Sequence, residues 1–260
     1  MTLKANPSLP VEPQKAEPPI AFFSTEASAT ERGDSRLPVL HPAFDFRLAQ
    51  NCRLQLSGAP CTHYGFVYDG EGLLRIANRE HPVVQGMYFT AAGDVCLDLA
   101  GEAIVVSQKN HCGLFSLGGP IEEEGRLRYI DGCSDTLLIP PLLMGDACLN
   151  FLKIPPHTHQ TSHTHPSFRF GMIVAGAGWC DSPAGFEELT PGKLFFIPAD
   201  GTHRFRTEEK SLSVIAFHPD SDFGPEDDNH PMVNKTIVNG VSAAELSHEQ
   251  RGISATEDAT

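Results

Sequence analysis

The sequence predicts an all-β protein built as two β units in tandem. Short apolar segments alternate with Gly, Pro and Asp through the middle of the chain, which has no long stretch of helical periodicity. Many short strands separated by frequent turns are typical of a β-sandwich or barrel. Glycine positions also recur at a fixed interval in this middle region, which indicates two units rather than one.

The expected strands are short segments rich in Val, Ile, Phe, Tyr and Leu. They cover residues 64–68, 72–76, 103–106, 171–174, 193–197 and 212–217. Residues 1–36 are rich in Pro, Ala, Glu, Ser and Thr, which predicts a flexible N-terminal arm. Residues 241–260 are expected to be a C-terminal tail, with Ser242 and Glu245 at capping-box spacing for one short helix.

Four glycines of the first unit recur 106 residues later in the second. They are Gly65, Gly70, Gly72 and Gly86, and their counterparts are Gly171, Gly176, Gly178 and Gly192. Similar apolar residues flank each member of the repeat, as in Tyr-Gly-Phe-Val-Tyr and Phe-Gly-Met-Ile-Val. We therefore expect two β units, at 37–140 and 141–240.

Three histidines of the second unit have the spacing of metal ligands. His163 and His165 are separated by one residue, and His203 ends the segment Pro-Ala-Asp-Gly-Thr-His. Alternate side chains of a strand share a face, so His163 and His165 can point into one cavity. A third imidazole from a neighbouring strand would complete three nitrogens on one side of a metal. The remaining positions would stay open, as in catalytic sites.

The first unit is expected to lack this triad. At the 106-residue offset the counterparts of the three histidines are Ser57, Ala59 and Leu97, and a slip of one residue at the last position offers Cys96 or Asp98. The first unit would then pack against the second or shape its cavity.

These residues resemble the two motifs of the cupin superfamily. The first motif reads Gly, five residues, His-x-His, three or four residues, Glu, six residues, Gly. Here His157 stands at the first Gly, Arg169 at the Glu and Gly176 at the last Gly. The second motif reads Gly, five residues, Pro-x-Gly, two residues, His, and it is matched from Gly192 to His203 with its inner Gly shifted by one.

The resemblance implies a bicupin, which is two tandem double-stranded β-helix barrels of the jelly-roll type, with the first one degenerate. Because Arg169 replaces the glutamate ligand, the site resembles that of three-histidine cupins, which include thiol, gentisate-type and diketone-cleaving dioxygenases. Their ferrous iron binds substrate and oxygen, so Fe(II) and molecular oxygen are the expected partners. Imidazole also suits Zn, Ni, Mn and Cu, so the ligand set does not select the metal.

Arg169 has the strand parity of His163 and His165 and is expected to face the barrel interior. A guanidinium buried near a dication needs an anion, which is either a substrate carboxylate or an Asp or Glu of the barrel. His157 and His159 form a second His-x-His, either exposed or at the rim, where His159 is the better candidate for a general base. His218 is a further candidate for the barrel interior.

The first functional hypothesis is an Fe(II) oxygenase or dioxygenase acting on a small carboxylate-bearing molecule. Its metal ligands are His163, His165 and His203, and Arg169 and His159 are its candidate catalytic residues. The second hypothesis keeps the metal but performs isomerase, lyase or hydrolase chemistry. The third is a cupin that binds a small molecule without catalysis. His63 and Tyr64 of the first unit are weak site candidates.

Composition limits the partners further. The net charge of −14 and the pI near 5.2 argue against nucleic acid and anionic membranes, which reward basic residues. No apolar run approaches the roughly 20 residues that span a bilayer, and no secretory signal precedes residue 36. Seven scattered cysteines without a C-x-x-C pair indicate reduced thiols and a cytoplasmic location. A homodimer is expected because barrel edges need covering.

Overall fold

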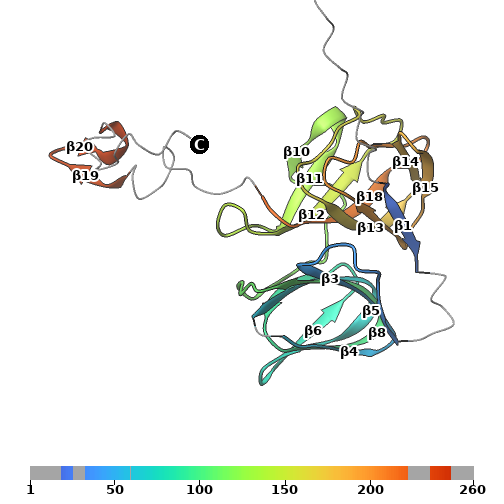
Figure 1. The fold of residues 1–260 in the computed structure, drawn as a ribbon, viewed down its shortest axis with the longest axis horizontal. Helices are drawn as coiled ribbons and strands as arrows, with labels where there is room; N and C mark the ends of the chain where they lie inside the picture. Colours follow the sequence, from blue (N-terminus) through green and yellow to red (C-terminus); the bar gives the residue numbers. More distant parts are fainter. Residues whose placement is uncertain (1–18, 26–32, 59, 222–234, 247–260) are drawn as a thin grey trace, which may run out of the picture.

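The computed structural model describes residues 19–25, 33–58, 60–221 and 235–246, and these residues are almost entirely β-structure. Figure 1 shows two β-barrels packed against each other, with the earlier part of the chain forming one and the later part the other. The predicted all-β class with tandem barrels is therefore confirmed. The described residues include two 3-10 turns, Ile130–Gly132 and Ala243–Glu245.

The first barrel is built around one antiparallel sheet in the order β2-β3-β8-β5-β7-β9, with β4 also on β8 and β6 also on β5. The strands are β2 (Gly33–Arg36), β3 (Phe44–Gln50), β4 (Arg53–Leu56), β5 (Cys61–Ile76), β6 (Arg79–Val84), β7 (Tyr88–Ala92), β8 (Val95–Lys109) and β9 (Ser116–Gly118). The long strands β5 and β8 run side by side along their length.

The second barrel combines a sheet in the order β1-β16-β13-β18-β12-β11-β10 with a smaller sheet in the order β15-β14-β17. Its strands are β1 (Ala21–Ser24), β10 (Leu127–Arg128), β11 (Ser134–Ile139), β12 (Cys148–Ile154), β13 (Arg169–Gly176), β14 (Gly178–Ser182), β15 (Gly185–Leu189), β16 (Lys193–Ile197), β17 (Arg204–Arg206) and β18 (Leu212–His218).

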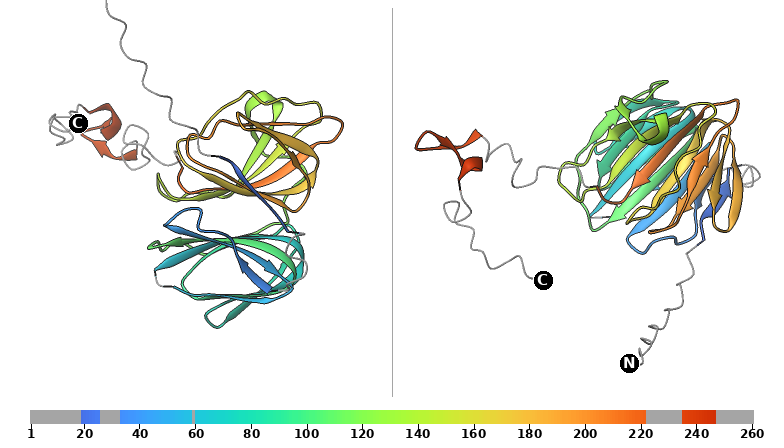
Figure 2. Two further views of the ribbon diagram at one scale, coloured as in Figure 1. Left: turned by 45° about the vertical axis from the view of Figure 1, so that its right-hand side comes forward. Right: turned by 90° about the horizontal axis from the view of Figure 1, so that it is seen from above.

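Two predicted boundaries are corrected by the strand pairing. Residues 21–24 and 33–36 were expected in a flexible arm, but β1 pairs with β16 of the second barrel and β2 pairs with β3 of the first. Strands β10 and β11 precede the predicted boundary at 140, yet they extend the second sheet from β12. In both cases the strand partner decides which barrel a segment joins, and local composition does not reveal that partner. Figure 2 shows β1, in dark blue, lying among the strands of the second barrel.

The C-terminal segment forms a small hairpin, β19 (Ile237–Val238) with β20 (Val241–Ser242), followed by the turn Ala243–Glu245. The hydroxyl of Ser242 accepts a hydrogen bond from the backbone N–H of Ala244 at 3.2 Å, so the predicted cap is present, on a 3-10 turn. The predicted arm before residue 19 and the tail after residue 246 lie outside the described residues.

The glycine repeat has the same structural role in both barrels. Gly65 pairs with Phe89 and Gly171 pairs with Phe195 on the neighbouring strand. A Cβ added to Gly65 would lie 2.2 Å from the ring of Phe89, and one added to Gly171 would lie 2.4 Å from that of Phe195. Both sites accommodate a ring that lies flat over the glycine, so a side chain there is excluded. This pair of the predicted repeat therefore has the same role in both barrels.

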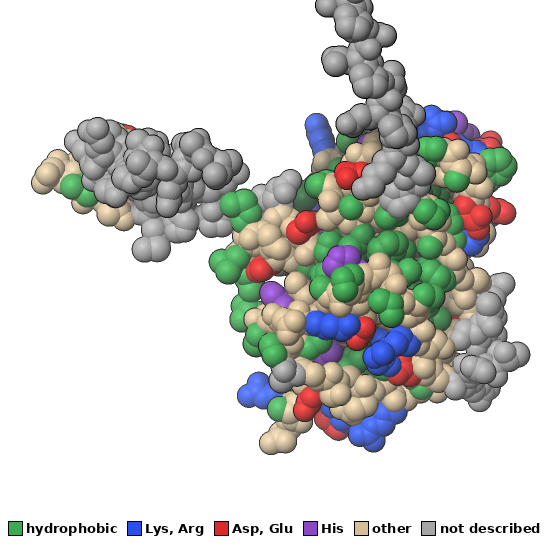
Figure 3. Space-filling model, in the orientation of Figure 1, with side chains coloured by type: hydrophobic (Ala, Val, Ile, Leu, Met, Phe, Trp, Pro, Cys, Tyr) green, Lys and Arg blue, Asp and Glu red, His purple; other side chains and the backbone are tan. Residues whose placement is uncertain are grey.

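A large aromatic core joins the two barrels. One face of β3, β5 and β8 packs against one face of β12, β13, β16 and β18, with Phe46 and Phe170 at 4.7 Å between ring centroids. Phe168 stacks on Phe196 at 5.1 Å, and Tyr64 contacts Phe217. Hydrophobic side chains also gather near this junction on the face drawn in Figure 3. The barrels therefore support each other through buried apolar surface.

Candidate metal centre

The three predicted histidines converge at one point of the second barrel. One ring nitrogen from each of His163, His165 and His203 lies within 4.8 Å of the other two. The ring centroids are 4.5 to 5.2 Å apart, and His203 is buried while the other two are partly exposed. The group opens toward the cavity of the second barrel, whose walls include all three rings.

Backbone pairing fixes these rings. His163 and His203 exchange two backbone hydrogen bonds, at 2.9 and 3.0 Å, which form an isolated antiparallel bridge. The backbone N–H of Asp200 donates to the carbonyl of His165 at 2.8 Å. Asp200 has a positive φ of 59° and occupies the position of the inner glycine of the second motif. Asp tolerates this left-handed conformation better than most residues, so the turn survives without glycine.

The tautomers of two rings suit metal binding. The Nδ1 atom of His163 donates to the carbonyl of Thr161 at 2.7 Å, and that of His203 donates to the carbonyl of Gly201 at 2.9 Å. A proton held on Nδ1 leaves Nε2 with a free lone pair. Burial, with a smaller contribution from Arg169, lowers the pKa of His165 to about 3 and that of His203 to about 4. These imidazoles stay neutral at physiological pH, so this donor set fits a divalent transition metal.

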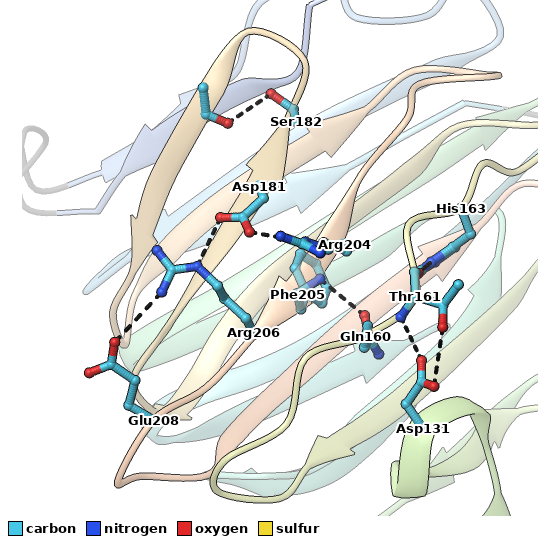
Figure 4. Close-up of polar contacts among 11 residues, drawn as sticks. Asp131, Gln160, Thr161, His163, Asp181, Ser182, Arg204, Phe205, Arg206 and Glu208 are labelled. Atoms are coloured by element: carbon cyan, nitrogen blue, oxygen red, sulfur yellow. Dashed lines mark hydrogen bonds and ion pairs between the residues drawn. The ribbon is translucent and has the colours of Figure 1, made fainter.

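An aspartate outside the barrel interior supports the first histidine (Figure 4). The carboxylate of Asp131 accepts hydrogen bonds from the backbone N–H of Thr161 at 2.6 Å and from its hydroxyl at 3.2 Å. The carbonyl of the same Thr161 accepts the Nδ1–H of His163. Asp131 itself lies in the turn before β11 with a positive φ of 53°. The chain Asp131–Thr161–His163 therefore orients one candidate ligand from behind.

The cavity beside the histidines has a volume of about 250 Å³ and is mainly apolar. Phe195, Phe205, Leu137, Leu152, Ile197, Val214 and Ala216 supply its apolar walls. Arg169, Asp135, Asn150 and His218 supply polar groups, and Leu127, Arg128 and Tyr129 lie on the side of β10. A small organic molecule with one polar end would suit such a site.

Arg169 lines this cavity, as its strand parity predicted. It begins β13 opposite Ile197, and its Nη1 donates to the carbonyls of Ser167 and Phe168 at 3.2 and 2.9 Å and to the Ser167 hydroxyl at 2.7 Å. The Ser167 hydroxyl in turn donates to Asp220. The guanidinium also contributes to the lowered pKa of His165, His203 and His218, which places its charge close to the triad.

The prediction that His159 is a catalytic residue is corrected. His159 is exposed and does not line the cavity, whereas its neighbour Gln160 is buried and does. His157 is also exposed and lies 3.8 Å from Glu209, with a positive φ of 56°. The bridge of His159 with Arg206 and that of His163 with His203 differ in register by one residue, so the alternation shifts between them and the even-numbered Gln160 lines the same cavity as His163 and His165.

Other cavity residues had weaker signals or none. His218, a minor candidate, lines the cavity, and burial lowers its pKa well below the usual value. Asp135 on β11 and Asn150 on β12 were not predicted. Asn150 interrupts the apolar start of β12, which is the signal in the sequence that points to it, whereas Asp135 lies between Ser134 and Thr136 and has no such signal. Burial raises the pKa of Asp135 to about 6, against the opposing hydrogen bond from Asn150.

The first barrel carries leucines at the positions of the triad. Leu54 pairs with Leu97 where His163 pairs with His203, and Leu56 follows two residues after Leu54. All three leucines belong to the apolar core that fills the first barrel. The predicted equivalence of Leu97 holds, but that of Ser57 is wrong, because the segment before His163 is longer than the one before Leu54. Ala59 lies outside the described residues.

The two weak candidates of the first barrel do not reach the triad cavity. His63 is buried and bonded to the Ser107 hydroxyl at 2.7 Å and the Gly93 carbonyl at 2.9 Å. Tyr64 lines a separate cavity near His111 and Asp146.

The fold is the double-stranded β-helix found in cupin structures, and its second barrel carries the three-histidine cluster. A model of the AraC-like ligand binding domain matches residues 148–224, which includes all three histidines. A comparison of the sequence with curated proteins gave no significant match.

Solved structures with the same fold cover most of the chain. A putative glyoxylate-induced protein of Pseudomonas aeruginosa is 12% identical, with a TM-score of 0.63 over 83% of this chain and 95% of that one. Salicylate 1,2-dioxygenase of Pseudaminobacter salicylatoxidans is 10% identical, with a TM-score of 0.61 over 79% and 87%. A cupin barrel protein of Leptotrichia buccalis is 13% identical, with a TM-score of 0.59 over 80% and 98%. At these identities the likeness shows the fold alone.

All seven cysteines are free thiols, and only Cys112 is exposed. Within the described ranges, no helix has the length and apolar character needed to cross a bilayer.

Proposed function

We propose that this protein is a mononuclear metal-dependent cupin enzyme, an Fe(II) oxygenase or dioxygenase that acts on a small carboxylate-bearing molecule. The observation that carries the proposal is the convergence of His163, His165 and His203 on a cavity that also contains Arg169. A dioxygenase among the proteins of similar fold supports the choice of oxygen chemistry, by analogy of fold.

When bound, ferrous iron supplies Lewis acidity and redox chemistry with molecular oxygen. The protein would hold the metal, orient the substrate and exclude water. The three imidazoles would hold the ion as neutral ligands, and the apolar walls exclude water from the reacting groups. Arg169 binds the carboxylate of the substrate and thereby orients its reactive end toward the histidines.

Charge supports an anionic substrate. Three neutral ligands would leave a bound divalent ion with its full charge, and Arg169 adds another positive charge in the same cavity. Among the described residues that line the cavity, Asp135 supplies the one carboxylate. A substrate carboxylate would offset this excess of positive charge in a weakly polar environment.

The test is metal analysis combined with oxygen uptake. The purified protein is loaded anaerobically with Fe(II), and oxygen uptake is followed as small carboxylic acids are added. We expect about one iron per chain, its loss in His163→Ala, and its retention in the matched control His159→Ala. Arg169→Ala should retain iron but weaken substrate binding about tenfold or more. Equal iron content in wild type and His163→Ala would contradict the site.

A second function has its own supporting observation. Asp135 lies in the cavity with a pKa near 6, which suits a general acid or base for isomerase, lyase or hydrolase chemistry. Turnover under strict anaerobiosis would favour this function over the oxygenase. A binding-only role is supported by the match to a ligand-binding domain, and it predicts ligand affinity that survives removal of the metal.

The proposal extends to the whole chain. We propose a bicupin in which the barrel of about 33–118 is degenerate and supports the barrel of about 127–221. A homodimer and a cytoplasmic location with reduced thiols remain part of this proposal. Light scattering of the purified protein tests the dimer. The net charge of −14 continues to argue against nucleic acid as a partner.

A further inference from the structure

The cavity has a second polar wall opposite in charge to Arg169. Asp135 and Asn150 lie on the adjacent strands β11 and β12, and both line the cavity. The side-chain N–H of Asn150 donates to the Oδ1 of Asp135 at 2.9 Å. This hydrogen bond orients the carboxyl group and favours its ionised form.

The amide of Asn150 has unfilled acceptor capacity. Asn150 is only 8% exposed, and its Oδ1 is buried without a hydrogen-bond partner among the described residues. A buried acceptor without a donor is unfavourable, and such atoms in native proteins often belong to a functional site. A donor group of a ligand that lies against Asp135 would lie beside this oxygen.

Asp135 and Arg169 are close enough to act on the same groups. Burial raises the pKa of the Tyr129 hydroxyl, Asp135 raises it further and Arg169 lowers it. The Cys148 thiol also experiences both charges, in addition to its burial. The cavity therefore offers a negative group and a positive group to one small molecule.

We propose that Asp135 and Asn150 form a subsite for the amino group of the substrate, so that the substrate is a small amino acid. This inference rests on the proposed function, in which Arg169 binds the carboxylate. A protonated amine donates up to three hydrogen bonds. Its positive charge would offset the negative charge of the buried Asp135 carboxylate, and one of its N–H groups would give the Asn150 oxygen a donor. Burial alone disfavours the ionised Asp135, and a cationic ligand would reverse that effect.

Four acids with the same four-carbon skeleton separate the contributions of the carboxylate and of the amino group to binding. Butyrate carries the carboxylate alone, 2-hydroxybutyrate adds a neutral donor, and 2-aminobutyrate and 4-aminobutyrate add an ammonium group at two distances. Their affinities are measured by ligand-observed NMR titration, on Zn(II)-loaded protein and on chelator-treated protein. We expect one amino acid to bind at least tenfold more tightly than butyrate.

The variants test the residues directly. Asp135→Asn should abolish this preference and leave the affinity for butyrate within about threefold of wild type. Asn150→Leu should reduce the preference several-fold. Asp98→Asn, the same chemical change at an exposed position of the first barrel, is the matched control and should leave the preference intact. Thermal unfolding of each variant verifies that it is folded.

Three outcomes would overturn the subsite. One is equal binding of all four acids, or of none, to wild type. Another is a preference that persists in Asp135→Asn. The third is tightest binding of 2-hydroxybutyrate, which would assign a neutral donor instead. Failure of the proposed function is a separate result, because it would appear as absent iron binding or oxygen uptake. The preference among the acids is still measured on chelator-treated protein.

Discussion

Three leucines occupy, in the first barrel, the strand positions that three histidines occupy in the second. They are Leu54, Leu56 and Leu97. Their exposures are 0 to 3%, and the interior around them is filled by apolar side chains. The second barrel keeps the same paired strands but places imidazoles, Arg169 and Asp135 around a cavity.

The comparison shows that the strand framework of a barrel and the residues in its interior can vary independently. The glycines that let the frame close recur in both barrels, as at Gly65 and Gly171. The two barrels differ in the identity of a few inward-facing residues. These residues fill the first barrel with an apolar core, and in the second barrel they line a cavity with polar groups. Substitutions that exchange these residues between the barrels test this view.

The largest effect is expected from His203→Leu, which gives the second barrel the residue of the first. Loss of one of three ligands should lower metal affinity by about 100-fold or more. The metal-free variant should remain folded, because leucine is accepted at the matching position. Isothermal titration with Zn(II) measures the affinity, and circular dichroism checks the fold. Unchanged Zn(II) affinity would contradict the view that the histidine is what distinguishes the second barrel from the first.

The reverse change, Leu97→His, should destabilise the first barrel by about 2–4 kcal/mol. Leu97 is fully buried, so an imidazole there would lose its hydration among apolar neighbours. No metal site should result, since Leu54 and Leu56 supply no ligand atoms. Urea unfolding of both proteins gives the difference, and a second Zn(II) equivalent in the variant would contradict the prediction.

A smaller effect is expected from Asp131→Ala, which removes the support behind His163. Loss of the hydrogen bonds to Thr161 should weaken metal affinity about tenfold while leaving all three ligands in place. Asp181→Ala is the control, because Asp181 binds Arg204 and Arg206 on β17 and does not touch the histidines (Figure 4). Equal losses of affinity in the two variants would show a general effect on stability instead.

The smallest effect is a pH-dependent gain of stability in Asp135→Asn. Burial raises the pKa of Asp135 from 3.8 to about 6, so the folded state holds this proton more tightly than the unfolded chain. Wild type therefore loses stability as pH rises from about 4 through 6. We expect the chelator-treated variant to exceed wild type by about 1–2 kcal/mol at pH 7.5, and by nothing at pH 4. Urea unfolding at both values checks this, and a constant difference would contradict it.

The all-β fold and the three histidines could be predicted from the sequence because short sequence patterns indicate both. The His-x-His spacing and the glycine repeat need no knowledge of distant contacts. Arg169 also lines the cavity as expected, although the chain bends between His165 and the start of β13, so a continuous strand is not the reason.

Errors arose where backbone geometry or long-range pairing intervened. His159 was misassigned because the pairing with residues 203–206 shifts by one residue between His159 and His163, so the two side chains do not share a face. Strand β11, which carries Asp135, was assigned to the wrong unit because its partner β12 identifies it only in three dimensions. Asn150 was missed because a single polar residue in an apolar strand has no spacing to match.

Strand β1 has a consequence for how copies of this chain could associate. It precedes the first barrel in sequence but completes the edge of β16, the strand that carries the cavity residues Phe195 and Ile197. Only the eight residues 25–32 connect β1 to β2, so the connection spans roughly 30 Å at most. An element that docks on a remote edge through a short tether can be exchanged between neighbours by domain swapping. Removal of residues 1–32 would instead leave the edge of β16 unpaired, and a strand of another chain could then pair with it beside the site.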